Sequence, residues 1–241
     1  MKHRIDLHIH TVLSPCGDWS MSPVAIAKMA KHMHLDLISI TDHNSIYNIP
    51  ACEKTCHVMG IEVVPGIEIQ TKEEVHLLGY FESYEKISKF YDEYEKTLPY
   101  IALDPETQDT EVIVDENDEV ITEEKRYLIV SSSLSLEECI LLIHKYDGLA
   151  VASHVDRSAF SVISQLGFIP EDAEFDGIEI FSTLEGLPEK FPKICSSDAH
   201  YIGDIGKKYS SFECEKELEG RAFDILKDKL INRQIICHKG G

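Results

Sequence analysis

The chain has 241 residues, of which 43% are apolar and 27% charged, a composition typical of a globular protein large enough to bury a core. Its 43 acids against 23 Lys and Arg give a net charge of −20, which disfavours a groove for long nucleic acid because cations must meet the phosphates. No apolar run could cross a bilayer or serve as a secretory signal, and seven cysteines without a CxxC pair favour reduced thiols in a cytoplasmic protein.

Strand-like and helix-like segments alternate along the chain. Alternating apolar residues in IDLHIH (5–10) predict a first strand, and Ser22-Pro23 predicts the start of a helix. Further strands are expected in LDLISI, IEVVPGIEIQT, EVHLLGY, GLAVASH, GIEIF and KICSSDAH, and further helices at 49–59, 83–97, 134–146 and 217–230. This alternation favours mostly parallel pairing through right-handed crossovers, in a barrel or an open sheet.

One acidic segment interrupts the alternation. Ten acids lie between Asp104 and Arg126, where EVIV and EVIT flank DEND and predict a hairpin around Asn117-Asp118. We interpret residues 104–127 as a solvated excursion from one domain that spans residues 1–241. A lid over a site or a dimer contact is the alternative for this segment.

Histidines and acids coincide with the ends of the expected strands. The residues in these positions are His8, His10, Asp42, His43, Glu68, His76, His154, Asp198 and His200. The carboxyl ends of parallel strands meet at one rim of a barrel, which is where catalytic sites are built. Imidazole and carboxylate are ligands of Zn, Mn and Fe, so this coincidence indicates a metal site. The other six histidines lie on helices or near the chain ends and are interpreted as solvated or packing residues.

The motifs also occur in a familiar order. HIH (8–10), TDHN (41–44), GIEI (66–69), His76, SHVDR (153–157) and SDAH (197–200) resemble the successive motifs of the PHP family, the polymerase and histidinol-phosphatase metal-dependent phosphoesterases. The resemblance extends from residue 6 to about residue 206 and is to free-standing members, since no polymerase segment follows. It implies an α/β fold, a distorted (β/α)7 barrel with a metal site at the C-terminal ends of the strands.

The resemblance further implies two or three divalent ions, expected to be Zn, Mn or Fe. The implied ligands of the first ion are His8, His10, Glu68 and Asp198. Glu68 would bridge to a second ion, which His76 and His154 would also bind. The residues expected to act in catalysis are Glu68, Asp198 and His200.

A third ion would be bound by His43, His200 and one ligand from the loop after the first strand. That loop, TVLSPCGDWS, offers Cys16 or Asp18. We choose Asp18, because a carboxylate suits the hard ions of a hydrolytic site whereas a thiolate suits softer ions and oxidises readily. For Asp6 and Asp42 we expect either a hydrogen bond to a neighbouring imidazole or simple bonding at a strand end.

The expected activity is hydrolysis of small phosphate monoesters or nucleotides by a hydroxide that bridges two ions. Arg157 is the candidate for binding the phosphate through its planar guanidinium, with a surface salt bridge as the alternative. The expected partner is therefore a small phosphorylated substrate, with neither long nucleic acid nor a membrane. Two other functions stay open: an exonuclease that acts on short oligonucleotide ends, and a metal-binding regulatory module without catalysis.

Overall fold

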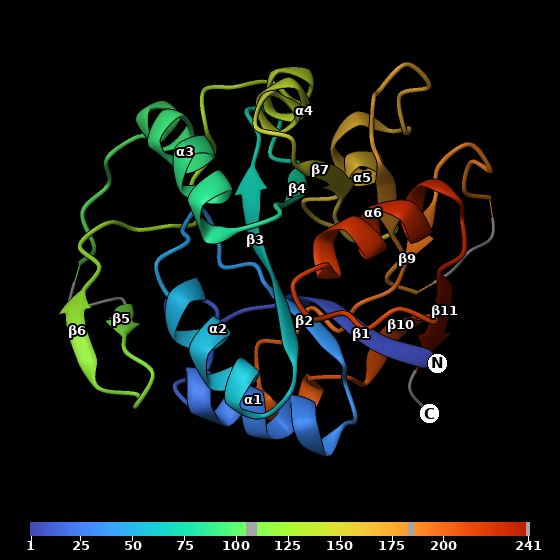
Figure 1. The fold of residues 1–241 in the computed structure, drawn as a ribbon. Helices are drawn as coiled ribbons and strands as arrows, with labels where there is room; N and C mark the ends of the chain where they lie inside the picture. Colours follow the sequence, from blue (N-terminus) through green and yellow to red (C-terminus); the bar gives the residue numbers. More distant parts are fainter. Residues whose placement is uncertain (105–109, 183–185, 240–241) are drawn as a thin grey trace.

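The computed structural model describes residues 1–104, 110–182 and 186–239 (Figure 1). In these residues the chain forms an α/β fold with one nine-stranded sheet and one two-stranded hairpin. The strands are β1 (Lys2–Ile9), β2 (Leu37–Ile40), β3 (Glu62–Gln70), β4 (His76–Tyr80), β5 (Val112–Val114), β6 (Val120–Glu123), β7 (Leu149–Ala152), β8 (Gly177–Glu179), β9 (Lys193–Ile194), β10 (Lys208–Glu213) and β11 (Ile236–Lys239). The helices are α1 (Pro23–His32), α2 (Ile49–Val58), α3 (Tyr84–Tyr94), α4 (Leu136–Lys145), α5 (Val162–Leu166) and α6 (Ala222–Ile231), with short 3₁₀ turns at Glu95–Thr97 and Ile202–Asp204.

The large sheet is nearly closed into a barrel. Its strand order is β11-β10-β1-β2-β3-β4-β7-β8-β9, and the segment that follows β9 returns to β1. There the Ala199 amide donates to the His8 carbonyl over 3.2 Å, and the His10 amide donates to the Ala199 carbonyl over 3.0 Å. This closure confirms the expected distorted barrel and places residues near 198 directly beside the end of β1.

The pairing of strands differs from the expectation. Parallel pairs join β1 to β2, β2 to β3, β7 to β8 and β8 to β9, but β4 runs antiparallel to β3 and β7, and β10 runs antiparallel to β1 and β11. The prediction of mostly parallel pairing is therefore wrong. The short turn from Thr71 to Val75 explains why β4 runs antiparallel to β3, because a parallel pair would need a longer crossover. Reversal brings the beginning of β4, with His76, to the edge where β3 ends.

The helices begin close to where their sequence signals place them. The Ser22 hydroxyl accepts a hydrogen bond from the Ala25 amide and Pro23 is the first residue of α1, so the expected cap is confirmed. Helix α6 begins at Ala222 and not at residue 217, because Gly220 has a φ of +64° outside the helical region. Among the described residues, no helix combines the length and the apolar character that a membrane span requires.

The acidic hairpin is attached to the barrel. β5 and β6 pair antiparallel, with Asp118 at a φ of +65° in the turn, which confirms the hairpin around Asn117-Asp118. The Asn48 side chain accepts from the Val114 amide over 3.0 Å, and the Asp118 carboxylate accepts from the Ser22 hydroxyl over 2.7 Å. The hairpin therefore lies beside α1 and α2 and is not free in solvent (Figure 1). Residues 105–109 of this acidic segment lie outside the described residues.

Candidate metal centre

The expected ligands come together at one edge of the barrel. His8 lies near the end of β1 and His10 directly follows that strand. Glu68 lies near the end of β3, His76 begins β4, and His154 follows β7. The segments after β2 and β9 add His43, Asp198 and His200. All of these side chains are buried except His200, which is partly exposed. Residues far apart in the sequence thus form one compact group of imidazoles and carboxylates.

Four donor atoms have the spacing of a metal site. They are Nε2 of His8, Nε2 of His10, Oε2 of Glu68 and Oδ1 of Asp198. The two imidazole nitrogens lie 3.1 Å apart, and each lies 3.3–3.4 Å from both carboxylate oxygens. Ligands about 2.0–2.2 Å from a tetrahedral ion lie about 3.3–3.6 Å from one another. These separations suit a divalent cation held by the two imidazoles and a carboxylate, and the ligand atoms of His8, His10 and Asp198 all lie within 4.8 Å of one another. Glu68, the fourth ligand expected for the first ion, adjoins both imidazoles.

Glu68 extends the group to a second set of donors. Its other oxygen, Oε1, lies 3.1 Å from Nδ1 of His76 and 3.2 Å from Nε2 of His154. The Ser153 hydroxyl donates to the same oxygen over 2.9 Å and so holds the carboxylate in place. Because its two oxygens face different imidazoles, Glu68 has the orientation that a bridging ligand needs.

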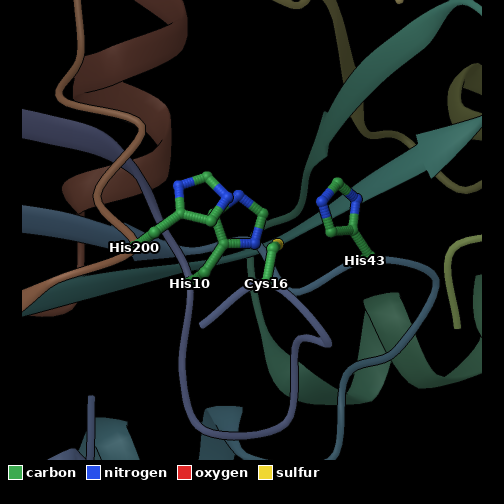
Figure 2. Close-up of side chains that lie close together, drawn as sticks. All are labelled: His10, Cys16, His43 and His200. Carbon is green, nitrogen blue, oxygen red and sulfur yellow. The ribbon is translucent and has the colours of Figure 1, made fainter. Parts of the chain in front are cut away.

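A third set of donors includes Cys16. The ligand atoms of His10, Cys16, His43 and His200 all lie within 4.8 Å of one another, and Figure 2 shows these four side chains converging. Asp18 belongs to no such group among the described residues. Its carboxylate accepts hydrogen bonds from the amide and hydroxyl of Ser20. Among the described residues the geometry therefore favours Cys16 as the loop donor, while the choice of Asp18 stays a prediction.

The electrostatics of the group favour a bound cation. Burial acts to lower the pKa of His8, but the charges of Glu179 and Asp198 outweigh it and raise this pKa well above 6.5. Burial also lowers the pKa of His43 well below 6.5, which keeps that ring in the neutral form that binds metals. The carboxylates that would hold a proton on His8 can equally hold a divalent cation in its place.

Glu179 is a site residue that the sequence reasoning missed. Its carboxylate lies 3.0 Å from Nδ1 of His8 and accepts from the His154 amide, also over 3.0 Å. A carboxylate behind the distal ring nitrogen holds an imidazole in the tautomer and direction that a metal needs. The sequence shows it only as a single Glu inside the apolar strand GIEIF, and the fold leaves it 2% exposed.

Asp6 and Asp42 support the site without touching an imidazole directly. Asp6 accepts from the amides of Ser197 and Gly206, which flank the segment that carries Asp198, and burial raises its pKa to about 6. Asp42 accepts from the Ser14 hydroxyl over 2.7 Å, and that hydroxyl lies 2.9 Å from Nδ1 of His10. Asp6 therefore holds a neighbouring segment through backbone hydrogen bonds, which is the second expectation. Asp42 acts on the imidazole of His10 through the Ser14 hydroxyl.

Arg157 lies at the rim of the same group. Its Nη1 is 2.5 Å from Oδ2 of Asp198, so its ion pair is with a candidate ligand and not with a remote surface acid. Its side chain keeps 36% exposure, and its guanidinium carbon lies 4.7 Å from the ring centroid of Phe181. A cation is thus available to solvent directly beside the candidate ligands.

Three known proteins resemble this chain in sequence or in fold. An uncharacterized protein of Methanocaldococcus jannaschii is 28% identical over 187 residues, 74% of this chain and 81% of that protein. A 5′-3′ exoribonuclease of Haemophilus influenzae is 30% identical over 82 residues, 33% of this chain and 29% of that protein. The crystal structure of the lesion-specific endonuclease PfuEndoQ from Pyrococcus furiosus aligns with a TM-score of 0.68 at 20% identity, over 96% of this chain and 56% of that one.

The chain thus spans little more than half of that endonuclease and under a third of the exoribonuclease. At 20% identity, the likeness to the endonuclease shows the fold alone. The family comparison covers much more of the sequence. The model of the PHP domain matches residues 6–177, which include all of the candidate ligands that precede Asp198. The chain therefore belongs to the PHP domain family of metal-dependent phosphoesterases.

Proposed function

We propose that this protein hydrolyses phosphate monoesters of small molecules or nucleotides, with two or three divalent ions of Zn, Mn or Fe at the candidate metal centre. The observation that carries the proposal is the set of donor separations of 3.1–3.4 Å among His8, His10, Glu68 and Asp198. Ions bound there would supply an activated water and neutralise phosphoryl oxygens. A regulatory module that had lost catalysis would also be expected to have lost metal ligands. In this chain each of the main ligand positions carries an imidazole or a carboxylate.

The chain's own residues position the reaction. Glu68 would bridge neighbouring ions through its two oxygens, and Asp198 would share its carboxylate between an ion and Arg157. Arg157 would bind a non-bridging oxygen of the phosphate through its planar guanidinium. His200 is partly exposed, and burial, aided by the charge of His10, lowers its pKa to about 4. The ring is therefore neutral near pH 7 and open to solvent on one side.

Exposed aromatic side chains favour a substrate that carries a base. Trp19 is 56% exposed, Tyr201 59% and Phe160 37%. The Asp18 amide donates to the His200 carbonyl, which places Trp19 and Tyr201 on adjoining segments, and the Phe160 ring stacks on His76 at 4.8 Å. Bases stack on exposed aromatic rings with little regard for sequence. This rim and the exoribonuclease relative support a second candidate function, removal of nucleotides from short oligonucleotide ends.

The test is a panel of phosphoesters assayed with the metal-reconstituted protein. We expect chelation with confirmed metal loss to abolish hydrolysis, and Mn or Zn to restore it, because the proposed nucleophile is a water that the bound ions activate. Release of free phosphate from mononucleotides supports the phosphatase function, whereas release of mononucleotides from a dinucleotide or trinucleotide supports the exonuclease. Full activity after complete metal removal would contradict both functions.

A further inference from the structure

Two cations at the rim of the metal centre share one aromatic ring. The ammonium nitrogen of Lys208 lies 3.4 Å from the ring centroid of Phe181, and the guanidinium carbon of Arg157 lies 4.7 Å from the same centroid. The face of an aromatic ring attracts cations, so Phe181 gives both side chains a defined position. Neither the metal ligands nor the proposed chemistry accounts for Lys208.

The segment that carries the Phe181 ring is held in place by hydrogen bonds to its backbone. Asp156, next to Arg157 in the chain, accepts hydrogen bonds from the amides of Phe181 and Ser182, each over 2.6 Å. These bonds fix the segment after β8 to the segment after β7. Arg157, Phe181 and Lys208 thus form a fixed assembly, which we call the cation platform.

The cation platform adjoins the metal centre. Arg157 pairs with Asp198 at 2.5 Å, which puts its guanidinium beside a candidate ligand. Lys208 is the first residue of β10, and β10 is antiparallel to β1, so Lys208 lies at the edge of the sheet where β1 ends. Asp198 thus pairs directly with Arg157, whereas Lys208 joins the platform through the ring of Phe181.

Lys208 lacks an anionic partner in the part of the chain that the structure describes. Arg157 is balanced by Asp198, whereas no carboxylate lies within 4 Å of the Lys208 ammonium group among the described residues. Burial, and then the charge of Arg157, lower the pKa of Lys208, which reflects the cost of holding a second cation there. In a chain with a net charge of −20, a lysine at a catalytic rim that has no ion pair among the described residues fits an anionic ligand, and the more distant charges of Asp198, Glu179 and Asp156 favour its protonated form.

We propose that Lys208, held on Phe181, is a second anion subsite that binds the phosphodiester next to the phosphate being hydrolysed. The proposal rests on the proposed function, because the metal centre and Arg157 would hold the reacting phosphate. It assigns the substrate to a class: a nucleotide chain of at least two phosphates, whose second phosphate lies on Lys208. Lys208 is then a positioning residue that acts on affinity for such substrates.

The experiment compares two cleavage-resistant dinucleotides with the same 5′-phosphonate. One carries a charged phosphorothioate linkage and the other an uncharged methylphosphonate linkage, so that they differ by one charge. Dissociation constants are measured by calorimetry on the metal-reconstituted protein, with the fluorescence of Trp19, the single tryptophan, as a second readout. We expect the wild type to bind the charged dinucleotide about tenfold more tightly.

The variant Lys208→Gln should remove this preference while leaving the affinity for the uncharged dinucleotide and the metal content unchanged. The slope of log Kd against log salt for the charged ligand should fall in magnitude by about 0.7. Lys208→Arg should recover most of the preference. The matched control is Lys207→Gln, because Lys207 is 64% exposed and pairs with Asp204 away from the ring.

A preference for the charged dinucleotide that survives in Lys208→Gln would overturn the subsite. An equal loss of affinity for both ligands would also overturn it, because that result indicates a general structural role. If the wild type binds neither dinucleotide, the proposed function at this centre fails first. If it binds both equally well, only the second subsite fails.

Discussion

The identity of the loop donor is decided by how a short loop folds. Gly17 packs so closely that a Cβ there would lie 2.2 Å from the Thr11 carbonyl oxygen, and the loop therefore turns back over the site at this residue. This turn directs Cys16 toward His43 and leaves Asp18 on Ser20. Burial raises the pKa of the Cys16 thiol, so without a cation it stays protonated, whereas a bound metal would deprotonate it.

We expect Cys16→Ala to lower the bound metal by about one ion per chain and to reduce turnover, because it removes one donor of the third set. Asp18→Asn is the matched control and should keep the full metal content. Metal content is measured by mass spectrometry after reconstitution and desalting. Loss of an ion from Asp18→Asn with retention in Cys16→Ala would reinstate Asp18 as the ligand.

Glu179 is predicted to set the metal affinity of His8. Glu179→Ala removes the carboxylate behind Nδ1 of His8 and should weaken metal binding by about 10–100-fold. Glu179→Gln keeps an oxygen acceptor and should lose less. Competition with a metal-binding dye gives both affinities, and an unchanged affinity in Glu179→Ala would mean that His8 is oriented by other contacts.

The sequence predicts the candidate metal ligands much better than it predicts the residues that orient those ligands. His8 and His10 stand two residues apart at the end of a strand, and such pairs can be recognised locally. Glu179 could not be recognised, because its partner His8 lies 171 residues away in the chain and only barrel closure brings them together. The loop donor could not be settled from the sequence for another reason: ligand preference favoured Asp18, but the backbone path of the loop determines which side chain faces inward, and Cys16 is the one grouped with His10, His43 and His200.

At the scale of elements, local signals located helices and the hairpin, while pairing depended on connection length. Ser22-Pro23 marked the start of α1, and Asn117-Asp118 marked a turn. The strand β4 was predicted but its antiparallel direction was not, because its apolar residues look the same in either direction. Its direction follows from the five residues that join it to β3, too few for a parallel crossover.

The acidic hairpin contains a carboxyl group that should make stability depend on pH. Glu111, just before β5, is 2% exposed, and neither of its oxygens has a hydrogen-bond partner among the described residues. Burial, and then the charges of Glu124 and Asp42, raise its pKa from 4.5 to about 8. Between these two pKa values the native state keeps a proton on Glu111 that the unfolded chain has lost. This residue therefore lowers the free energy of unfolding as pH rises from about 4.5 to about 8.

We expect the free energy of unfolding of the wild type to decrease more between about pH 5 and pH 8 than that of Glu111→Gln, whose neutral amide has a similar shape. The variant should also be the more stable protein at the upper end of this range. Urea unfolding at a series of pH values, with metal held constant, measures both curves. Parallel curves would show that Glu111 is already ionised in the native state.

The whole molecule combines a strongly acidic chain with a site that attracts cations. The resemblance carried by the ordered motifs implied the barrel, whereas the alternation of strands and helices alone left a barrel or an open sheet open. Closure through Ala199 could not be predicted from local pattern, because it joins residues separated by nearly the whole chain. Three divalent ions would add about six positive charges, and the molecule would remain acidic.

This charge predicts a preference in substrate length. A long strand must bring many phosphates past acidic surface, with few Lys or Arg to replace its counterions, whereas a short one places one or two phosphates on the ions and the cation platform. We expect a higher kcat/KM for mononucleotides and very short oligonucleotides than for long RNA or DNA at physiological salt.

The measurement is hydrolysis of a short substrate with single-stranded and duplex polymers added as competitors at equal phosphate concentration. Because salt screens repulsion from the acidic surface, the handicap of long strands should shrink as salt increases. A higher kcat/KM for long RNA or DNA at every salt concentration would show that the chain has a nucleic-acid path that its net charge does not reveal.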